Sequence, residues 1–137
     1  MLRSRIVSLA PCLALAGRLS AGAAAADAPA PPADLQPVTV EFFFEPGCHE
    51  CEQVRAQVLP DLDARFGSLC RIEERDLGIE TNYLRLAAWL EAAGAAENER
   101  VYLLIAGTRL LAGLPASVTG AAAAVEQALA AQVAEPL

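Results

Sequence analysis

The sequence predicts a single α/β domain with a small mixed four-stranded sheet and helices on both faces, in the order β-α-β-α-β-β-α. An apolar run rich in β-branched and aromatic residues, Val38–Phe44, is typical of a buried strand. Apolar residues then recur at every fourth position from Val54 to Phe66, as they do on one face of a helix. Two short apolar runs around the turn Ala106-Gly107-Thr108 indicate an antiparallel hairpin.

The first helix is expected from about Cys48 to Arg65, because Pro46-Gly47 breaks the strand before it. Pro60 should kink or divide this helix, since proline removes one backbone hydrogen bond. Gly67 is the expected C-cap of this helix. The alternating stretch Leu69–Asp76 then predicts the second strand.

The second helix is expected from an N-cap at Thr81 through Ala93, with Gly94 closing it. Its predicted inner stripe consists of Tyr83, Leu86, Leu90 and Ala93.

The predicted hairpin consists of strands Val101–Ile105 and Arg109–Ala112. A loop from Gly113 to Ser117 should follow, and Ser117 or Thr119 should cap a last helix that buries Val125, Leu129 and Val133. A strand–helix–strand crossover gives parallel strands and a hairpin gives antiparallel ones, so the sheet should be mixed.

Cys48 and Cys51 are expected on the first turn of the first helix. Residues three apart on a helix are neighbours at a spacing that a disulfide accepts, so the pair can cycle between dithiol and disulfide without backbone movement. A purely structural bridge would close a loop of about four residues, which limits its entropic gain to roughly 2 kcal/mol. A zinc site needs four ligands, and the chain has no second Cys-x-x-Cys or Cys-x-x-His pair, so a zinc site is disfavoured.

The strand, the Cys48-His49-Glu50-Cys51 motif and the helix after it resemble the thioredoxin superfamily, and the likeness extends weakly from about Val38 to the last helix. The resemblance implies that Cys48 attacks and that Cys51 resolves. No cofactor and no metal are expected. The unpaired N–H groups at a helix N-terminus favour a thiolate at Cys48. Cys51 lies deeper and should be less exposed.

His49 and Glu50 between the cysteines are expected to tune the dithiol. A protonated His49 would favour the Cys48 thiolate, and Glu50 would oppose it by like-charge repulsion. The pKa of the Cys48 thiol should then be lowered without being extreme, within the range of about 3.5–7.5 that such motifs show. A solvated turn that only tunes the redox potential is favoured for both residues over a direct role in proton transfer.

Glu41 lies inside an otherwise apolar strand, where an unpaired carboxylate would cost several kcal/mol, on the order of 3. The resemblance makes it a candidate acceptor for the Cys51 proton, because family members often hold a buried acid beneath the dithiol. The alternative is an acid at the start of the strand that reaches solvent or Arg71.

The chain differs from the thioredoxin family in lacking the cis-proline that thioredoxins carry before the third strand. Arg100 falls nearest that position, and a trans peptide bond is expected there because a cis bond before arginine costs ~3 kcal/mol. Without this proline the substrate groove is expected to differ from that of thioredoxins, and room for a metal at the cysteines is an alternative. Arg100 near Cys48 could also stabilise the thiolate.

Two further residues are expected to serve packing. Cys70 stands alone on the second strand and is interpreted as a small buried apolar group, with a reactive thiol as the alternative. Trp89 is interpreted as a packing residue of the second helix.

Residues 1–26 have the form of a secretory signal peptide, with a basic start, an apolar core over Ile6–Ala16 and a cleavage position after Ala26. A Pro/Ala-rich linker is expected over 27–37 and the folded domain over 38–137. The predicted mature chain holds seven arginines against all 17 acidic residues, a formal charge of −10 that argues against nucleic acid as a partner. No stable membrane insertion is expected after cleavage.

The sequence therefore predicts a periplasmic or secreted thiol–disulfide oxidoreductase that acts on protein thiols and disulfides. A reductase is favoured over an oxidase, with a membrane electron carrier as its expected donor. The alternatives are a copper- or metal-handling module of the same fold that uses Cys48, Cys51 and His49, and a redox-inactive interaction domain.

Overall fold

The strands form one four-stranded mixed sheet in the order β2-β1-β3-β4 in a computed structural model that describes residues 34–134. β1 pairs with β2 in parallel and with β3 antiparallel, and β3 pairs with β4 antiparallel. The predicted α/β class and the mixed sheet are confirmed. The elements are β1 (Val38–Phe44), α1 (His49–Gln53), η1 (Val54–Val58), α2 (Leu59–Phe66), η2 (Gly67–Leu69), β2 (Cys70–Asp76), α3 (Glu80–Ala93), β3 (Val101–Ile105), β4 (Arg109–Ala112) and α4 (Gly113–Ala134).

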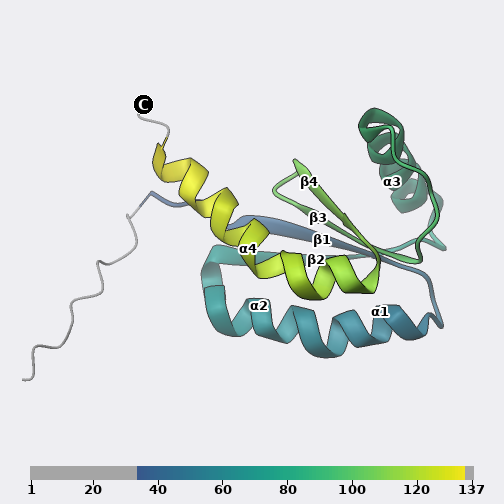
Figure 1. The fold of residues 1–137 in the computed structure, drawn as a ribbon, viewed down its shortest axis with the longest axis horizontal. Coiled ribbons are helices and arrows are strands. Elements are labelled where there is room, and N and C mark those ends of the chain that lie inside the picture. Colours follow the sequence, from purple (N-terminus) through teal and green to yellow (C-terminus); the bar gives the residue numbers. More distant parts are fainter. Residues whose placement is uncertain (1–33, 135–137) are drawn as a thin grey trace, which may run out of the picture. The chain divides into compact units, whose positions relative to one another are not determined.

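Helices cover both faces of the sheet, with α1, α2 and α4 on one side and α3 on the other (Figure 1). Side chains of a strand alternate between its faces. Val40 and Phe42 therefore pack in the cluster that contains Cys48 and Cys51, whereas Phe43 packs against α3. All five residues of β3 are buried, as expected for a strand covered on both sides.

Pro60 divides the first helix as predicted. The run from His49 to Phe66 is helical throughout, but Val54–Val58 forms a π-helical segment just before the proline. The Leu59 N–H donates to the Val54 carbonyl, five residues back. Pro60 has no N–H to continue the ordinary pattern, so the extra residue is accommodated in the turn that precedes it.

Two predicted helix starts are wrong. α3 begins at Glu80 with Ile79 as its N-cap, ahead of the expected cap at Thr81. α4 begins directly at Gly113, and the hydroxyls of Ser117 and Thr119 donate to carbonyls four residues back inside the helix. Ser and Thr make such bonds within helices as well as at caps, so the residue type alone does not mark the start.

The inner stripes of the helices are confirmed in part. Leu86 and Leu90 of α3 and Val125 of α4 are buried. Tyr83 is 41% exposed and donates its hydroxyl to Glu97, and Val133 is 61% exposed. Gly67 and Gly94 end α2 and α3 as predicted.

The predicted signal peptide, 1–26, and most of the predicted linker, 27–37, lie outside the described residues. At the described end of the linker, the Gln36 N–H and carbonyl exchange two hydrogen bonds with the Gln132 side chain on α4, at 2.8 and 3.0 Å. Within residues 34–134, no helix combines the length and apolar character needed to cross a membrane.

Candidate functional site

Cys48 and Cys51 form a disulfide at the point where the chain leaves β1 and enters α1, with their Cα atoms 5.2 Å apart. Cys48 is the N-cap of α1, one residue before the helix, and its Sγ accepts the Cys51 N–H at 3.1 Å. The turn before it contains Gly47 at φ 77°, a conformation that glycine adopts readily. The break Pro46-Gly47 thus ends the strand and places the first cysteine at the helix N-terminus.

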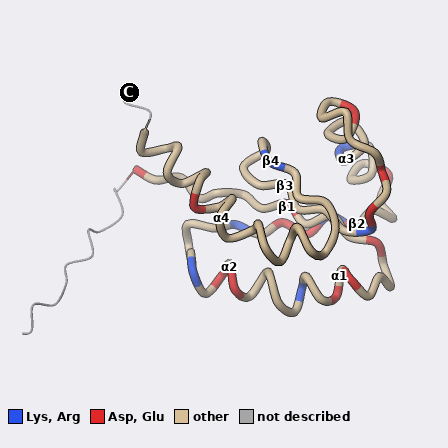
Figure 2. The backbone as a smooth tube through the Cα atoms, viewed as in Figure 1, with Lys and Arg blue, Asp and Glu red and all other residues tan. Residues whose placement is uncertain are grey.

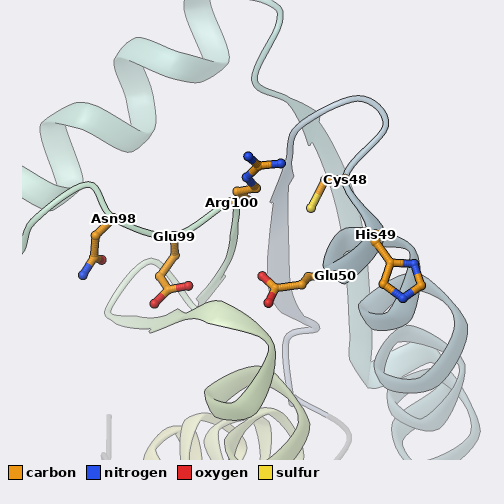
Figure 3. Close-up of a pocket in the computed structure, with 6 residues that line it drawn as sticks. All are labelled: Cys48, His49, Glu50, Asn98, Glu99 and Arg100. Atoms are coloured by element: carbon orange, nitrogen blue, oxygen red, sulfur yellow. The ribbon is translucent and has the colours of Figure 1, made fainter.

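Both cysteines are buried, Cys48 with 2% and Cys51 with 1% of its surface exposed. Cys51 is thus the less exposed of the two, as expected, but only by a very small margin. The two residues differ more clearly in what they face. A pocket of about 370 Å³ is lined by Cys48, His49, Glu50, Asn98, Glu99 and Arg100, and Cys51 does not contribute to it (Figure 3).

Arg100 lies beside the disulfide, directly before β3, as the sequence predicts. Its backbone carbonyl oxygen is 3.4 Å from the Cys51 Sγ, so in the dithiol state the Cys51 thiol can donate to it. None of the peptide bonds in residues 34–134 is cis, which confirms the trans bond expected here. The Arg100 side chain is 70% exposed, with its Nε 3.9 Å from a carboxylate oxygen of Glu45.

His49 and Glu50 lie differently, although both line the pocket. The His49 ring is turned outward in Figure 3, and its Nε2 lies 3.2 Å from the amide nitrogen of Gln53. The Glu50 side chain reaches into the pocket, on the side where Glu99 also lies (Figure 3). Glu50 is therefore the better placed of the two to act on the charge at Cys48.

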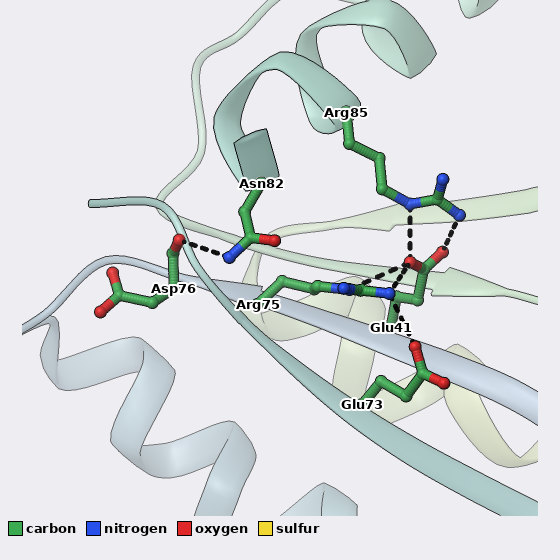
Figure 4. Close-up of polar contacts among 6 residues, drawn as sticks. All are labelled: Glu41, Glu73, Arg75, Asp76, Asn82 and Arg85. Atoms are coloured by element: carbon green, nitrogen blue, oxygen red, sulfur yellow. Dashed lines mark hydrogen bonds and ion pairs between the residues drawn. The ribbon is translucent and has the colours of Figure 1, made fainter. Parts of the chain in front are cut away.

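Glu41 does not lie beneath the dithiol. It is buried, 4% exposed, on the face of β1 opposite the one that packs with Cys51, where Phe43 contacts α3. Arg85 donates to both carboxylate oxygens at 2.7 and 2.8 Å, and Arg75 donates at 3.2 Å (Figure 4). The role of proton acceptor for Cys51 is therefore wrong, and so is the alternative of an acid that reaches solvent or Arg71.

The charge of Glu41 is stabilised by its arginine partners. Burial alone would raise the pKa of the Glu41 carboxyl, but the hydrogen bonds and charge of Arg85, with those of Arg75, outweigh it and lower the pKa. An acid held ionised in this way is a structural link between β1 and α3, because Arg85 belongs to α3.

Glu99 and Asn98 are site residues that the sequence does not single out. The Glu99 N–H donates to the buried Tyr102 hydroxyl at 3.0 Å. Its carboxylate lies against Gly113, where an added Cβ would come within 2.9 Å of Oε2. The sequence feature that could have pointed to them is their position directly before Arg100.

Cys70 lies at the other end of the sheet from the disulfide, paired with Val38 at the start of β1. It is partly buried against the core, and burial together with the Asp63 charge raises the pKa of its thiol. Trp89 packs partly buried on the α3 side of the sheet, as predicted. Over the described part of the chain, no three His, Cys, Asp or Glu side chains are grouped so as to hold a metal ion.

Comparisons with known proteins give little guidance. No protein-family model and no curated protein matches the chain. A solved structure titled "Structure of a malarial protein" matches 67% of this chain and 97% of its own, at 16% sequence identity and a TM-score of 0.47. A likeness of that degree carries no inference about fold family or function.

Proposed function

We propose that this protein is an exported thiol–disulfide oxidoreductase with a thioredoxin-like fold. The observation that carries the proposal is the Cys48–Cys51 disulfide at the N-terminal end of a helix that directly follows the central strand, with Cys48 facing a pocket. The N-terminus of this helical run, which continues to Phe66, favours the thiolate form of Cys48. The strand order and the helices on both faces are compatible with the proposed fold.

The proposed reaction transfers two electrons from the dithiol to a protein disulfide. The Cys48 thiolate attacks one substrate sulfur, and the other substrate sulfur leaves as a thiolate that takes up a proton. The Cys51 thiol loses its proton and attacks the Cys48 sulfur, which releases the second substrate thiol and forms the Cys48–Cys51 disulfide. A dithiol of a membrane electron carrier would then reduce that disulfide by the same exchange.

We propose that the protein acts as a reductase and not as an oxidase, on the basis of the charges around Cys48 and the length of the chain after the motif. A strong oxidase stabilises its reduced form through a very low thiolate pKa. Glu50 and Glu45 lie around Cys48, and such acids oppose a thiolate. The 48 residues from Glu52 to Glu99 also leave no room for the inserted helical domain of dedicated periplasmic oxidases.

Export is proposed from residues 1–26. Mass spectrometry of the mature protein from a periplasmic or secreted fraction should find an N-terminus near Asp27. An intact Met1 in a cytosolic fraction would contradict export.

Trapping of partners tests the roles of the two cysteines. Cys51→Ser should accumulate mixed disulfides with partner proteins, because the thiol that resolves them is gone. Cys48→Ser should trap few, and Cys70→Ser, at the other end of the sheet, should leave insulin reduction in the presence of dithiothreitol unchanged.

Three results would count against the proposal. Equal trapping by both variants would mean that the roles are wrong. Wild-type protein that reduces no insulin would favour a redox-inactive interaction domain. Copper or zinc that stays bound in stoichiometric amounts through dialysis under reducing conditions would favour a metal-handling module.

A further inference from the structure

The pocket over the disulfide has an uneven charge distribution. Red segments in Figure 2 mark acidic residues at the beginning of α1 and in the segment before β3, the two stretches that enclose the pocket. Glu50 and Glu99 line it directly, and Arg100 is the cation among its lining residues. Arg100 lies near Glu45, which offsets its charge in part.

The two pocket carboxylates have no counter-ion among the described residues, whereas several acids elsewhere in the domain do. Glu41, Glu52, Glu73, Glu74 and Asp61 all pair with arginines. Within residues 34–134, neither Glu50 nor Glu99 takes part in an ion pair or a side-chain hydrogen bond. Arg55, the arginine nearest to Glu50 in sequence, pairs with Glu52 and Glu74. Arg100, which directly follows Glu99, has its Nε 3.9 Å from a carboxylate oxygen of Glu45.

Glu99 is also held in place. Its backbone N–H is fixed by the Tyr102 hydroxyl, and its carboxylate occupies the space beside Gly113, which has no side chain. Glu50 projects from the short helix that starts at the disulfide. The two unpaired carboxylates are thus positioned beside Cys48 before any substrate binds, in a pocket of about 370 Å³.

We infer that this pocket selects protein substrates with an arginine or lysine next to the reacting cysteine. This inference rests on the proposed function, since the pocket is the one through which Cys48 would meet its substrate. A cationic side chain that enters beside Cys48 supplies the counter-ion that Glu50 and Glu99 lack. An acidic neighbour in the same place would be repelled.

The test uses three synthetic peptide disulfides that are identical except for the residue next to each cysteine, which is arginine, glutamine or glutamate. The dithiol form of the full protein should reduce the arginine peptide with a kcat/KM about fivefold above that of the glutamine peptide, with the glutamate peptide slowest. The ratio should shrink as salt is added, because partly exposed charges are screened.

Variants connect the preference to the pocket. Glu99→Gln and Glu50→Gln should each reduce the ratio between the arginine and glutamate peptides. Each variant is compared with Glu126→Gln, which removes the same charge from an exposed position well along α4. Because Glu50→Gln also changes the reactivity of Cys48 toward every peptide, the ratio and not the absolute rate is the measured quantity.

A second measurement does not depend on catalysis. Peptides with serine in place of cysteine are added to the oxidised protein, and amide NMR shifts at Asn98, Glu99 and Glu50 report binding. The arginine peptide should shift these signals and the glutamate peptide should not.

The outcomes separate the two proposals. Reduction of all three peptides at equal rates, with equal shifts, would overturn the inference and leave the proposed function standing. Reduction of none, with selective shifts by the arginine peptide, would overturn the proposed function and support cation recognition. A preference for the glutamate peptide would overturn the inference.

Discussion

Glu50 is the residue between the cysteines that reaches into the pocket beside Cys48, whereas His49 is turned away toward Gln53 (Figure 3). In the sequence each of the two residues is next to one of the cysteines, so the sequence alone does not tell them apart. Their opposite orientations mean that repulsion by Glu50 should dominate over any help from His49 in setting the charge on the Cys48 sulfur.

Removal of the Glu50 charge should therefore favour the thiolate. In a Cys51→Ser background, Glu50→Gln should lower the pKa of the Cys48 thiol by roughly half a pH unit, as expected for a nearby charge that is partly exposed to water. The measurement is the ultraviolet absorbance of the thiolate as a function of pH.

Glu126→Gln in the same background is the matched control and should leave the titration unchanged. An unaltered or raised pKa in Glu50→Gln would show that Glu50 does not act on Cys48. A pKa below ~4.5 in Cys51→Ser itself would place Cys48 with the oxidases and contradict the proposed direction of transfer.

At the scale of elements, the buried Glu41 carboxylate joins β1 to α3 through Arg85, and to β2 through Arg75 (Figure 4). The contact is two-pronged, with one Arg85 nitrogen on each carboxylate oxygen. Such bidentate pairs fix geometry as well as contributing energy. The pair therefore helps to hold α3 on the face of the sheet opposite the disulfide.

Glu41→Gln should lower the free energy of unfolding by about 2 kcal/mol, because charge-assisted hydrogen bonds are lost inside the protein while Arg85 can still reach water. The measurement is urea denaturation. Glu80→Gln, an exposed acid in the first turn of α3, is the control and should cost far less.

The same variant should change the response of stability to acid. The pKa of Glu41 is lowered in the folded protein, so its contribution is fully present above the unfolded value of about 4.3 and is lost as pH falls through the folded value. Wild-type stability should fall more steeply than that of Glu41→Gln below about pH 4.3. Parallel acid profiles would show that the ion pair contributes nothing.

At the scale of the whole molecule, the direction of electron transfer is linked to folding. A strong oxidant is one whose reduced form is the more stable form. The acids around Cys48 argue for the opposite balance here. The oxidised protein should therefore unfold at a urea concentration equal to or higher than that of the reduced protein. The difference in the free energy of unfolding should be at most about 2 kcal/mol, because the disulfide closes so short a loop.

Paired urea titrations of the predicted mature chain with and without dithiothreitol measure this difference. Cys70→Ser is used throughout so that the cysteine outside the pair in that chain plays no part. A reduced form that is clearly more stable than the oxidised form would favour an oxidase.

Local patterns in the sequence determined most of the elements. The apolar run of β1, its break at Pro46-Gly47 and the four-residue period after Cys51 are short-range features, and they place the cysteine pair at a strand-to-helix junction. The glycine caps Gly67 and Gly94 follow from a backbone conformation that glycine adopts at little cost.

The failures of the local patterns share a cause. Ser117 and Thr119 carry hydroxyls that bond equally well at a cap or inside a helix, so only packing against the sheet decides where α4 begins. For Glu41, alternation along β1 defines two faces, but it does not say which face the cysteine helix will cover. That choice depends on how the chain crosses over the sheet.

The sequence by itself determined the class of fold, the mixed sheet and the pairing of Cys48 with Cys51. The class and the strand directions follow from the order of the elements and their connections, and the two cysteines are three positions apart. Only the tertiary structure decided that Glu41 pairs with Arg85 of α3 and that Glu99 lines the pocket beside Cys48. Those contacts join residues more than forty positions apart, through packing on a sheet whose neighbours are not consecutive in sequence. No periodicity within one segment carries that information.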